Sequence, residues 1–547
     1  MLRAAQRSRE IRDRTLVDLA KMIHAHAEHL LSYRGHNNWY ISESTAILTA
    51  AAMVPAFRRA KFWMATAAAR LQRELFRQVR PDGTQFELSP GYHMMCADLF
   101  YLAWFRAGAR GFRFPAAYEK RLWAMFDYLA RITRPDGTHP VPNDAGCAMV
   151  KGNERLLLCG RARKRKDWIW AGSGGAEGSP PAAGSVHFAD AGHAVMRSGW
   201  TSDDRWAFLD MGQFGAGHQH EDKLQVELFA HGTAFLIDPG ISSYQTDPVV
   251  HYFRLSEAHN TVLVDGLGQW RTRSRDFAKY KSSSRGQNLW ATGRGLDIAQ
   301  GRYDEVYGES ATRALRSAMA SGQVVKTLEG IVHTRALVFV RPDYWLILDS
   351  VDGAGSHEAS ALWHFTPMHV RVDKPQAIVR TDRLTKPNLE LLCRGDWAGG
   401  RTELVTGRES PPQGFVAIDA ELKPAPCAIV SRRMRLPLHG VTVAVPYATG
   451  SESHFQVETS PAHGTSATKS AGMLITIRRP GGVTDRFLWR HTGAGALSAD
   501  GIRSDGLLSL VRTGSDGKVA YAAVAFGRSL REGKVKLKGN ARGLAER

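Results

Sequence analysis

The sequence predicts an α+β multidomain protein in which a helical domain, built as a toroid, precedes a large antiparallel β-sandwich. Three observations lead to this prediction. The first third of the chain carries apolar residues at the helical period, and the segment 161–185 is charged and then rich in Gly, Ser, Pro and Ala. Beyond it, apolar and polar residues alternate with a period of two, as in strands. Helices that precede strands, rather than alternating with them, are typical of separate α and β units.

The helical third is expected to contain several amphipathic helices. Helical patterns cover residues 14–31, 58–79, 92–108 and 116–132, and a further pattern, ESTAILTAAAMV, is interrupted by Pro55. Each pattern is long enough for a helix of a globular domain.

An internal repeat connects these helices. The sequence Arg-Pro-Asp-Gly-Thr occurs at Arg80–Thr84 and again at Arg134–Thr138, and each copy ends a helical pattern with a Pro-Asp-Gly turn. Helix pairs with equivalent connections favour a toroid over a compact bundle.

The change of composition and period defines four expected regions. They are a helical domain over 1–160, a linker over 161–185, a β-sandwich over 186–390 and a remaining β region over 391–547. Strand patterns such as HAVMRSGW, RWAFLDMG and ALVFVRPDYWLILDSVDG are separated by turns, which favours an antiparallel sandwich.

Composition excludes several classes of protein. A length of 547 residues predicts two or three domains, and no apolar run is long enough to span a membrane. The five cysteines are scattered without a CxxC pair, so neither a disulfide framework nor a zinc finger is expected. The basic start lacks the apolar core of a secretory signal, so we expect either a cytoplasmic protein or a sequence that begins inside a longer chain.

The charge balance indicates the kind of partner. Lys and Arg number 72 against 53 acidic residues, a net charge of +19 that attracts polyanions such as nucleic acid, anionic lipid or an acidic polysaccharide. No nucleic-acid-binding signature is present, so nucleic acid is not the expected partner. The basic cluster RARKRKDW, at 161–168, is interpreted as a solvated part of the linker.

The stretch Gly217–Gly240 carries the strongest chemical signal. Alternation of Leu224, Val226 and Leu228 predicts a half-buried strand, and the next apolar run is expected to pair back with it as a hairpin. This hairpin would carry the following Asp-Pro-Gly turn back towards the start of the stretch. The strand that follows the stretch begins beside a further histidine, His259.

Two imidazoles and a carboxylate would therefore converge at one sheet edge. They belong to His218, His220 and Asp238, and such a convergence is typical of a metal or catalytic site. The alternative is that these histidines cap strand ends by ordinary hydrogen bonding.

The helical half offers two more candidate groups. Asn37, Asn38 and Trp39 are expected in a loop between two helices, and Tyr92 and His93 open a helix after Pro-Gly. Asn pairs in loops ordinarily make turns, and a tyrosine at a helix mouth is ordinarily a rim or core aromatic.

Taken together, these motifs resemble the heparinase II/III group of polysaccharide lyases, which includes related alginate and oligoalginate lyases. The matching pieces occur in the order of the family, with similar gaps, over roughly residues 30–370. They are NNW at 37–39, DGTQFELSPGYH at 82–93, GHQHEDKLQVEL at 217–228, DPG at 238–240 and AHNTVLVDG at 258–266.

The resemblance implies an incomplete (α/α) toroid followed by an antiparallel β-sandwich, and a lyase that cleaves uronic-acid-containing chains by β-elimination. That reaction removes the C5 proton beside the uronate carboxylate and protonates the leaving O4, while donors aimed at the carboxylate stabilise its negative charge. A tyrosine whose pKa is lowered by its surroundings can act as base and then as acid.

Residue by residue, the resemblance implies that Asn38 binds the carboxylate, with Asn37 as the alternative. Tyr92 matches the catalytic tyrosine, and His218 matches the catalytic histidine, which is expected to neutralise the uronate carboxylate together with the asparagine. Asn37 and Trp39 are also expected to contact substrate, although some relatives have His where this chain has Trp39.

The resemblance further implies substrate contacts from Tyr252 and Arg254. His220, Asp238 and His259 match the positions that hold a structural zinc in several members, and two imidazoles with a carboxylate suit zinc.

Other properties follow from the same resemblance. The expected partner is an acidic polysaccharide, the expected location is the periplasm or cell envelope, and the toroid is expected to be shortened at its N-terminal side. Two alternatives stay open: a non-catalytic protein that binds acidic glycans, and a metal-dependent glycan hydrolase that uses the His/Asp cluster directly to activate water.

Overall fold

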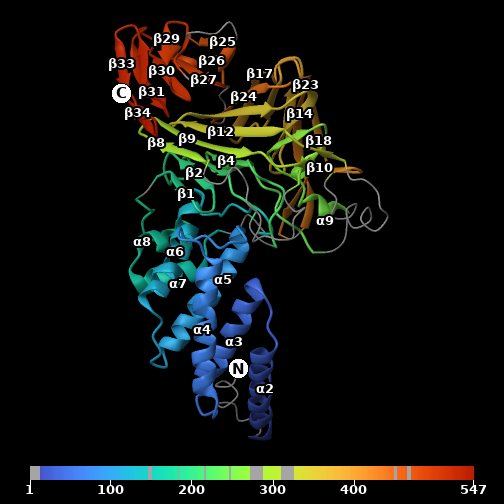
Figure 1. The fold of residues 1–547 in the computed structure, drawn as a ribbon, viewed down its shortest axis with the longest axis vertical. Coiled ribbons are helices and arrows are strands. Elements are labelled where there is room, and N and C mark those ends of the chain that lie inside the picture. Colours follow the sequence, from blue (N-terminus) through green and yellow to red (C-terminus); the bar gives the residue numbers. More distant parts are fainter. Residues whose placement is uncertain are drawn as a thin grey trace.

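The computed structural model arranges helices and sheets in successive layers. It describes residues 13–145, 151–182, 184–214, 217–244, 248–270, 287–309, 326–419, 421–448, 453–464, 470–493 and 495–547. Figure 1 shows the helices at one end of an elongated molecule and the sheet of the last residues at the other end. No helix within the described ranges combines the length and the apolar character needed to cross a bilayer.

The helices expected from the periodicity are present, with small shifts of their ends. They are α2 (Asp13–Ser32), α3 (Asn37–Met53), α4 (Ala60–Gln78), α5 (Pro90–Gly108) and α6 (Ala116–Ile132). Two further helices, α7 (Glu154–Arg163) and α8 (Lys166–Gly172), were not predicted from the periodicity. All of these helices share one apolar core to which Trp63, Phe100 and Leu122 contribute.

Two local predictions in this region are wrong. Asn37, Asn38 and Trp39 form the first turn of α3 and not a loop. The expected linker contains the end of α7 and all of α8, because Trp168 and Trp170 of α8 are buried in the helical core. The basic composition of this segment concealed its apolar face.

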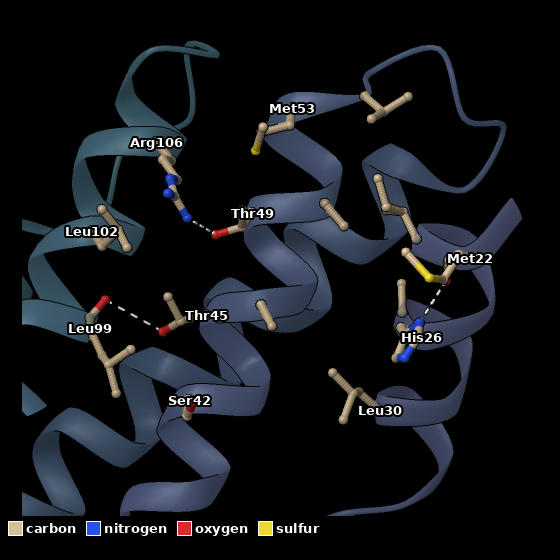
Figure 2. A pocket seen from close by; sticks show the side chains of 15 residues that line it. Met22, His26, Leu30, Ser42, Thr45, Thr49, Met53, Leu99, Leu102 and Arg106 are labelled. Atoms are coloured by element: carbon tan, nitrogen blue, oxygen red, sulfur yellow. Dashed lines mark hydrogen bonds between the residues drawn. The ribbon is translucent and has the colours of Figure 1, made fainter. Parts of the chain in front are cut away.

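An apolar groove lies between α2, α3 and α5 (Figure 2). Its volume is about 440 Å³, and its lining includes Met22, Leu30, Met53 and Leu102. The groove shares no residue with the site described below.

The two copies of the Arg-Pro-Asp-Gly-Thr repeat have the same geometry. In Arg80–Thr84 and Arg134–Thr138, the first backbone N–H donates to the last carbonyl, at 2.8 and 2.7 Å. In both, the Asp Oδ1 accepts from the Thr hydroxyl at 2.7 Å. The glycines adopt φ of +91° and +83°, a region that disfavours other residues.

Both copies attach the helical domain to the adjoining sheet. The Asp82 carboxylate accepts from the backbone N–H of Asp190 at 2.9 Å. Arg134 forms a buried ion pair with Glu227 of a central strand, and its guanidinium lies 5.3 Å from the Trp206 ring centroid. The repeat is therefore an interdomain joint as well as a helix stop.

The sheet next to the helices has five antiparallel strands. In spatial order they are β1 (Val186–Phe188), β2 (His193–Arg197), β3 (Trp206–Asp210), β4 (Val226–Ala230) and β5 (Thr233–Leu236).

Two further sheets form the main sandwich together with this five-stranded sheet. The four-stranded sheet contains β18 (Arg401–Thr406), β23 (Pro426–Arg435), β14 (Ser356–His364) and β6 (Val262–Val264). The eight-stranded sheet contains β15 (Val370–Asp373), β16 (Ile378–Thr381), β17 (Asn388–Gly395), β24 (Leu438–Tyr447), β13 (Tyr344–Asp352), β12 (Val332–Val340), β9 (Leu296–Tyr303) and β8 (Leu289–Thr292).

A ten-stranded sheet ends the chain. Its spatial order is β33 (Val535–Lys538), β32 (Ser529–Glu532), β29 (Ile502–Ser504), β28 (Leu497–Ala499), β25 (Gln456–Gly464), β26 (Ser470–Arg478), β27 (Thr484–Arg490), β30 (Leu508–Thr513), β31 (Val519–Ala525) and β34 (Leu544–Glu546). Smaller elements are α9 (Pro248–Tyr252), η1 (Ser256–Ala258), β7 (Gly268–Gln269), β10 (Tyr307–Gly308), β11 (Thr327–Leu328), β19 (Arg408–Glu409), β20 (Pro412–Gln413), β21 (Phe415–Ile418), β22 (Glu421–Pro424) and η3 (Pro480–Gly482).

The eight-stranded sheet is buried on both faces. In β12, Leu337 and Phe339 enter the core shared with the five- and four-stranded sheets, whereas Val338 and Val340 enter the core shared with the ten-stranded sheet. Successive side chains of a strand point to opposite faces, so one apolar strand serves two cores.

The expected boundary at residue 390 is misplaced. It falls inside β17, which pairs with β24 of the same sheet, so the sandwich continues well past residue 391. The separate last sheet begins only with β25. The period of two does not change at this boundary, which is why periodicity could not locate it.

Strand β4 is buried on both faces, where a half-buried strand was expected. Val226 and Leu228 lie in the sandwich core, and Phe229 packs in a cluster with Tyr128 and Ile132 of α6. The five-stranded sheet is therefore the layer between the helices and the rest of the sandwich. This position brings the start of α5 beside the loop before β4.

Candidate active site

Tyr92 lies in the first turn of α5. The helix starts with Ser89 as N-cap, whose Oγ accepts from the Tyr92 N–H at 3.4 Å, and Pro90 occupies the first helical position. The Tyr92 ring stacks on the imidazole of His218, with ring centroids 3.6 Å apart and an interplanar angle of 14°. The helical domain and the β domain thus each supply one member of this pair.

Tyr244 completes the aromatic side of the site. Its hydroxyl lies 2.8 Å from the Tyr92 hydroxyl, and its side chain is exposed. The Arg254 guanidinium lies 5.5 Å from the Tyr244 ring centroid. Tyr244 could not be predicted from the sequence, because ISSYQ carries no signal beyond its closeness to the Asp-Pro-Gly turn.

The surroundings of Tyr92 act against the expected lowering of its pKa. Burial raises the pKa of Tyr92 above its ordinary value, and the negative charges of Asp144 and Glu87 act in the same direction. The hydrogen bond from Tyr244 and the positive charge of Arg254 lower the pKa, but they offset only part of this increase. Tyr92 is therefore a protonated phenol at neutral pH.

Asp144 is the central carboxylate of the site. Its Oδ2 lies 2.8 Å from His218 Nδ1 and its Oδ1 lies 2.8 Å from His220 Nε2. Arg254 Nη2 donates to Oδ2 at 3.3 Å. Burial acts to raise the pKa of Asp144, but the hydrogen bonds from both histidines hold it well below its ordinary value. An ionised carboxylate can only accept hydrogen bonds, so His218 Nδ1 and His220 Nε2 carry the protons in these two bonds.

A second carboxylate lies on the other side of the His218 ring. Glu87 Oε2 is 3.9 Å from His218 Nε2, and burial raises the pKa of Glu87. Neither Glu87 nor Asp144 is among the site residues predicted from the sequence. Glu87 lies inside the motif DGTQFELSPGYH, which was the available signal, whereas VPNDAG resembles an ordinary turn.

Two family models match most of the chain. The heparinase II/III N-terminal model matches residues 2–154, and the heparinase II/III-like C-terminal model matches residues 180–409. The chain belongs to the heparinase II/III family.

Three curated relatives and several solved structures resemble it. A heparin-sulfate lyase of Pedobacter heparinus is 25% identical over 362 residues, and the match covers 64% of this chain and 49% of the relative. One from Bacteroides stercoris is 28% identical over 268 residues, covering 46% and 39%. The chain therefore spans about half or less of the length of these relatives.

The similarity to solved structures supports the fold class. A crystal structure of a heparan sulfate lyase from Pedobacter heparinus aligns with a TM-score of 0.67 and 21% identity, covering 89% of this chain and 72% of the other. A heparinase III crystal structure aligns with a TM-score of 0.69 and 19% identity, covering 87% and 71%. The predicted order of an incomplete toroid followed by a β-sandwich is confirmed.

Of the two catalytic residues that the heparinase II/III resemblance implies in the helical half, only Tyr92 lies against His218; Asn38 does not. Tyr92 contacts His218, but within the described part of the chain no hydrogen bond or ring contact joins Asn38 to either of them. Asn38 is buried in the first turn of α3. Gln78 connects this turn to the site, since its Nε2 donates to the Asn37 carbonyl at 2.9 Å and its Oε1 accepts from Gln85 at 3.5 Å.

The expected substrate contacts differ in exposure. Trp39 is 69% exposed, and the Arg254 side chain is 38% exposed beside Asp144. Tyr252 is only 2% exposed, and its hydroxyl bonds His364 Nε2 at 3.2 Å and the Gly414 N–H at 3.3 Å. The prediction of a substrate contact from Tyr252 is wrong, because the side chain supports the interior of the β domain.

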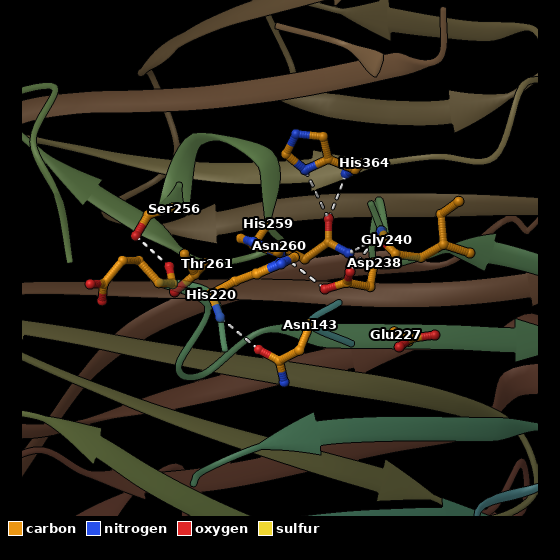
Figure 3. A network of polar contacts seen from close by, with 12 residues as sticks. Asn143, His220, Glu227, Asp238, Gly240, Ser256, His259, Asn260, Thr261 and His364 are labelled. Atoms are coloured by element: carbon orange, nitrogen blue, oxygen red, sulfur yellow. Dashed lines mark hydrogen bonds and ion pairs between the residues drawn. The ribbon is translucent and has the colours of Figure 1, made fainter. Parts of the chain in front are cut away.

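The three residues expected to hold zinc do converge. One ligand atom from each of His220, Asp238 and His259 lies within 4.8 Å of the others, and all three side chains are buried. Figure 3 shows them among buried polar groups that include Asn143 and Asn260. Two imidazoles and one carboxylate fit zinc. The hairpin of β4 and β5 brings Asp238 to His220, as the sequence predicted.

The burial of His93, which is next to Tyr92, should make the free energy of unfolding depend on pH. Its Nδ1 accepts from the Gln85 N–H at 3.2 Å and its Nε2 donates to the Met125 carbonyl at 3.0 Å, so it is neutral. Burial lowers the pKa of His93 to about 4. The unfolded chain therefore binds the proton first as the pH falls from about 6.5.

The contribution of His93 to the free energy of unfolding is complete above about pH 6.5 and decreases by up to about 3 kcal/mol as the pH falls towards 4. We expect His93→Gln, measured by denaturant unfolding, to be less stable than wild type at pH 7.5, with a difference that shrinks as the pH falls. A difference that stays constant between pH 7.5 and 4 would contradict this prediction.

Proposed function

We propose that this protein is a polysaccharide lyase that cleaves an acidic, uronic-acid-containing glycan by β-elimination. The observation that carries the proposal is the stacked pair of Tyr92 and His218, held by the ionised Asp144. Membership of the heparinase II/III family and the relatives named heparin-sulfate lyases support the same reaction class. The net charge of +19 suits a polyanionic substrate.

The geometry favours a division of the two proton transfers. His218 Nδ1 donates to Asp144, so Nε2 is the atom that accepts the C5 proton. The electron pair of the C5–H bond forms the C4–C5 double bond as the C4–O4 bond breaks. Tyr92, a protonated phenol, gives its proton to the leaving O4. This division differs from the one that the resemblance implies, in which Tyr92 makes both transfers and His218 helps to neutralise the carboxylate.

Neutralisation of the uronate carboxylate is the other requirement of the reaction. We assign it to Arg254, which is partly exposed beside Asp144. The Asn38 amide, which the resemblance implies for this role, is buried in the first turn of α3. A planar guanidinium matches a carboxylate in two hydrogen bonds, which lowers the free energy of the charge that develops at the carboxylate.

Ultraviolet absorbance tests the function directly. Purified protein incubated with heparan sulfate, hyaluronan, alginate and other uronate polysaccharides is expected to produce absorbance from the new C4–C5 double bond. Binding to a glycan with no absorbance change would favour the non-catalytic alternative. New reducing ends without absorbance would favour the hydrolase.

We also propose that His220, Asp238 and His259 hold a structural zinc ion. Such an ion would supply positive charge at a buried carboxylate and would cross-link the loop before β4, the end of β5 and the segment before β6.

Removal of the metal is expected to lower stability. We expect about one zinc ion per chain by elemental analysis, and a lower Tm after dialysis against a chelator that zinc restores. His259→Ala is the matched variant, since it should remove both the zinc and the response of Tm to the chelator. A metal-free wild type with an unchanged Tm would contradict the proposal.

A further inference from the structure

Tyr92 and His218 belong to different domains, and a short segment between them contacts both. We propose that Asn143 and Asp144, here called the Asn-Asp clasp, position the two residues for proton transfer and select the tautomer of His218. The inference rests on the proposed lyase function for its kinetic effect. It does not rest on that function for its structural effect.

On the helical side, the clasp holds the start of α5. Asn143 Nδ2 donates to the Leu88 carbonyl at 3.1 Å, and Ser89 Oγ donates to the Asp144 carbonyl at 3.0 Å. Ser89 is also the N-cap that accepts from the Tyr92 N–H. The clasp therefore fixes the residues that set the direction of the Tyr92 side chain.

On the β side, the clasp holds the loop that carries His218. The Asp144 N–H donates to the His218 carbonyl at 3.1 Å, and Asn143 Oδ1 accepts from the His220 N–H at 2.7 Å. The Asp144 carboxylate bonds the rings of His218 and His220 at 2.8 Å each. Backbone and ring of His218 are therefore both restrained by one residue.

The clasp itself is buried. Asn143 is 0% and Asp144 3% exposed. Asn143 adopts φ of +68°, a left-handed conformation that Asn tolerates better than most residues. A buried segment with its polar groups bonded to two domains has little freedom to move.

The chemical consequence is a defined proton acceptor. A carboxylate on Nδ1 keeps the proton on that atom, which leaves the lone pair on Nε2. Without it, neutral imidazole exchanges between two tautomers, and only one can accept a proton at Nε2. A displacement of about 1 Å between reacting groups is enough to cost ~10²-fold in rate.

Asp144→Asn tests the kinetic part, because the amide keeps the volume but can place a donor against His218 Nδ1. We expect kcat to fall by about 10²- to 10⁴-fold with KM changed less than about threefold. Asp98→Asn, a partly exposed aspartate on α5 that pairs with Arg155, is the matched control and should keep wild-type kcat. Zinc content is measured for each variant.

A double-mutant cycle separates positioning from a general structural defect. If Asp144 acts through His218, Asp144→Asn should cause less than about threefold further loss of kcat in the His218→Gln background. An equal loss in both backgrounds would overturn the proposal.

A spectroscopic readout keeps the inference testable even if no glycan is cleaved. In ¹⁵N-histidine-labelled wild type, long-range ¹H–¹⁵N correlations of His218, assigned by their absence in His218→Gln, should show the Nδ1–H tautomer at neutral pH. Asp144→Asn should move this population towards the Nε2–H tautomer. An Nε2–H tautomer in the wild type would overturn the inference, whereas a wild type with the expected tautomer and no lyase activity would refute only the proposed function.

Discussion

Tyr92→Phe is expected to reduce the rate of β-elimination by about 10²- to 10⁴-fold, the range of general acid–base catalysis. The substitution removes only the hydroxyl, so the stacking of the ring on His218 should persist. Because the phenol is the proposed donor to O4, the loss should appear in kcat rather than in KM. The absorbance assay measures both constants.

Tyr244→Phe is the matched control for this prediction. It removes the hydroxyl that bonds Tyr92 at 2.8 Å but leaves the Tyr92 phenol in place. We expect a loss of about two- to tenfold, which corresponds to one hydrogen bond. Equal losses in the two variants would contradict the assignment of the donor to Tyr92.

The second large effect is expected in stability. Arg134→Ala should reduce the free energy of unfolding by about 3–5 kcal/mol, because it leaves the Glu227 carboxylate buried without its ion-pair partner. Both side chains of this pair are almost completely buried, at 1% and 0% exposed. Denaturant unfolding of wild type and variant at neutral pH measures the difference.

The repeat supplies the control at the equivalent position. Arg80 donates to the Asp190 carbonyl at 2.6 Å but is partly exposed, so Arg80→Ala should cost no more than about 1 kcal/mol. A comparable loss from both arginines would show that the turn geometry, and not the buried ion pair, accounts for the stability of the joint.

Much of the fold was predictable from the pattern of side chains. The helices over 92–108 and 116–132 match α5 and α6 closely, because their apolar faces repeat with a helical period over many residues. The strands of the sandwich were equally clear from alternation. Local composition misled where it disagrees with tertiary burial, as in the basic segment that forms α8. The expected domain boundary fell inside β17, because the period of two continues from one sheet into the next.

The candidate site was predictable only where residues stand in a recognisable motif. Tyr92, His218 and the triad of His220, Asp238 and His259 were identified in this way, and the structure brings the triad together through the hairpin. Tyr252 shows the limit of this reasoning. Its position in the motif suggested contact with substrate, yet its side chain turns into the core.

The sequence by itself determined the order of domains, the repeat and the motifs that carry the candidate site residues, because periodicity and motif are local properties of the chain. Only the tertiary structure decided what surrounds those side chains. Asp144 lies 74 residues from His218 and Tyr244 lies 152 residues from Tyr92, and neither spacing has a pattern. The protonation and orientation of the candidate site residues depend on burial and on partners from another domain, and these exist only once the two domains have packed together.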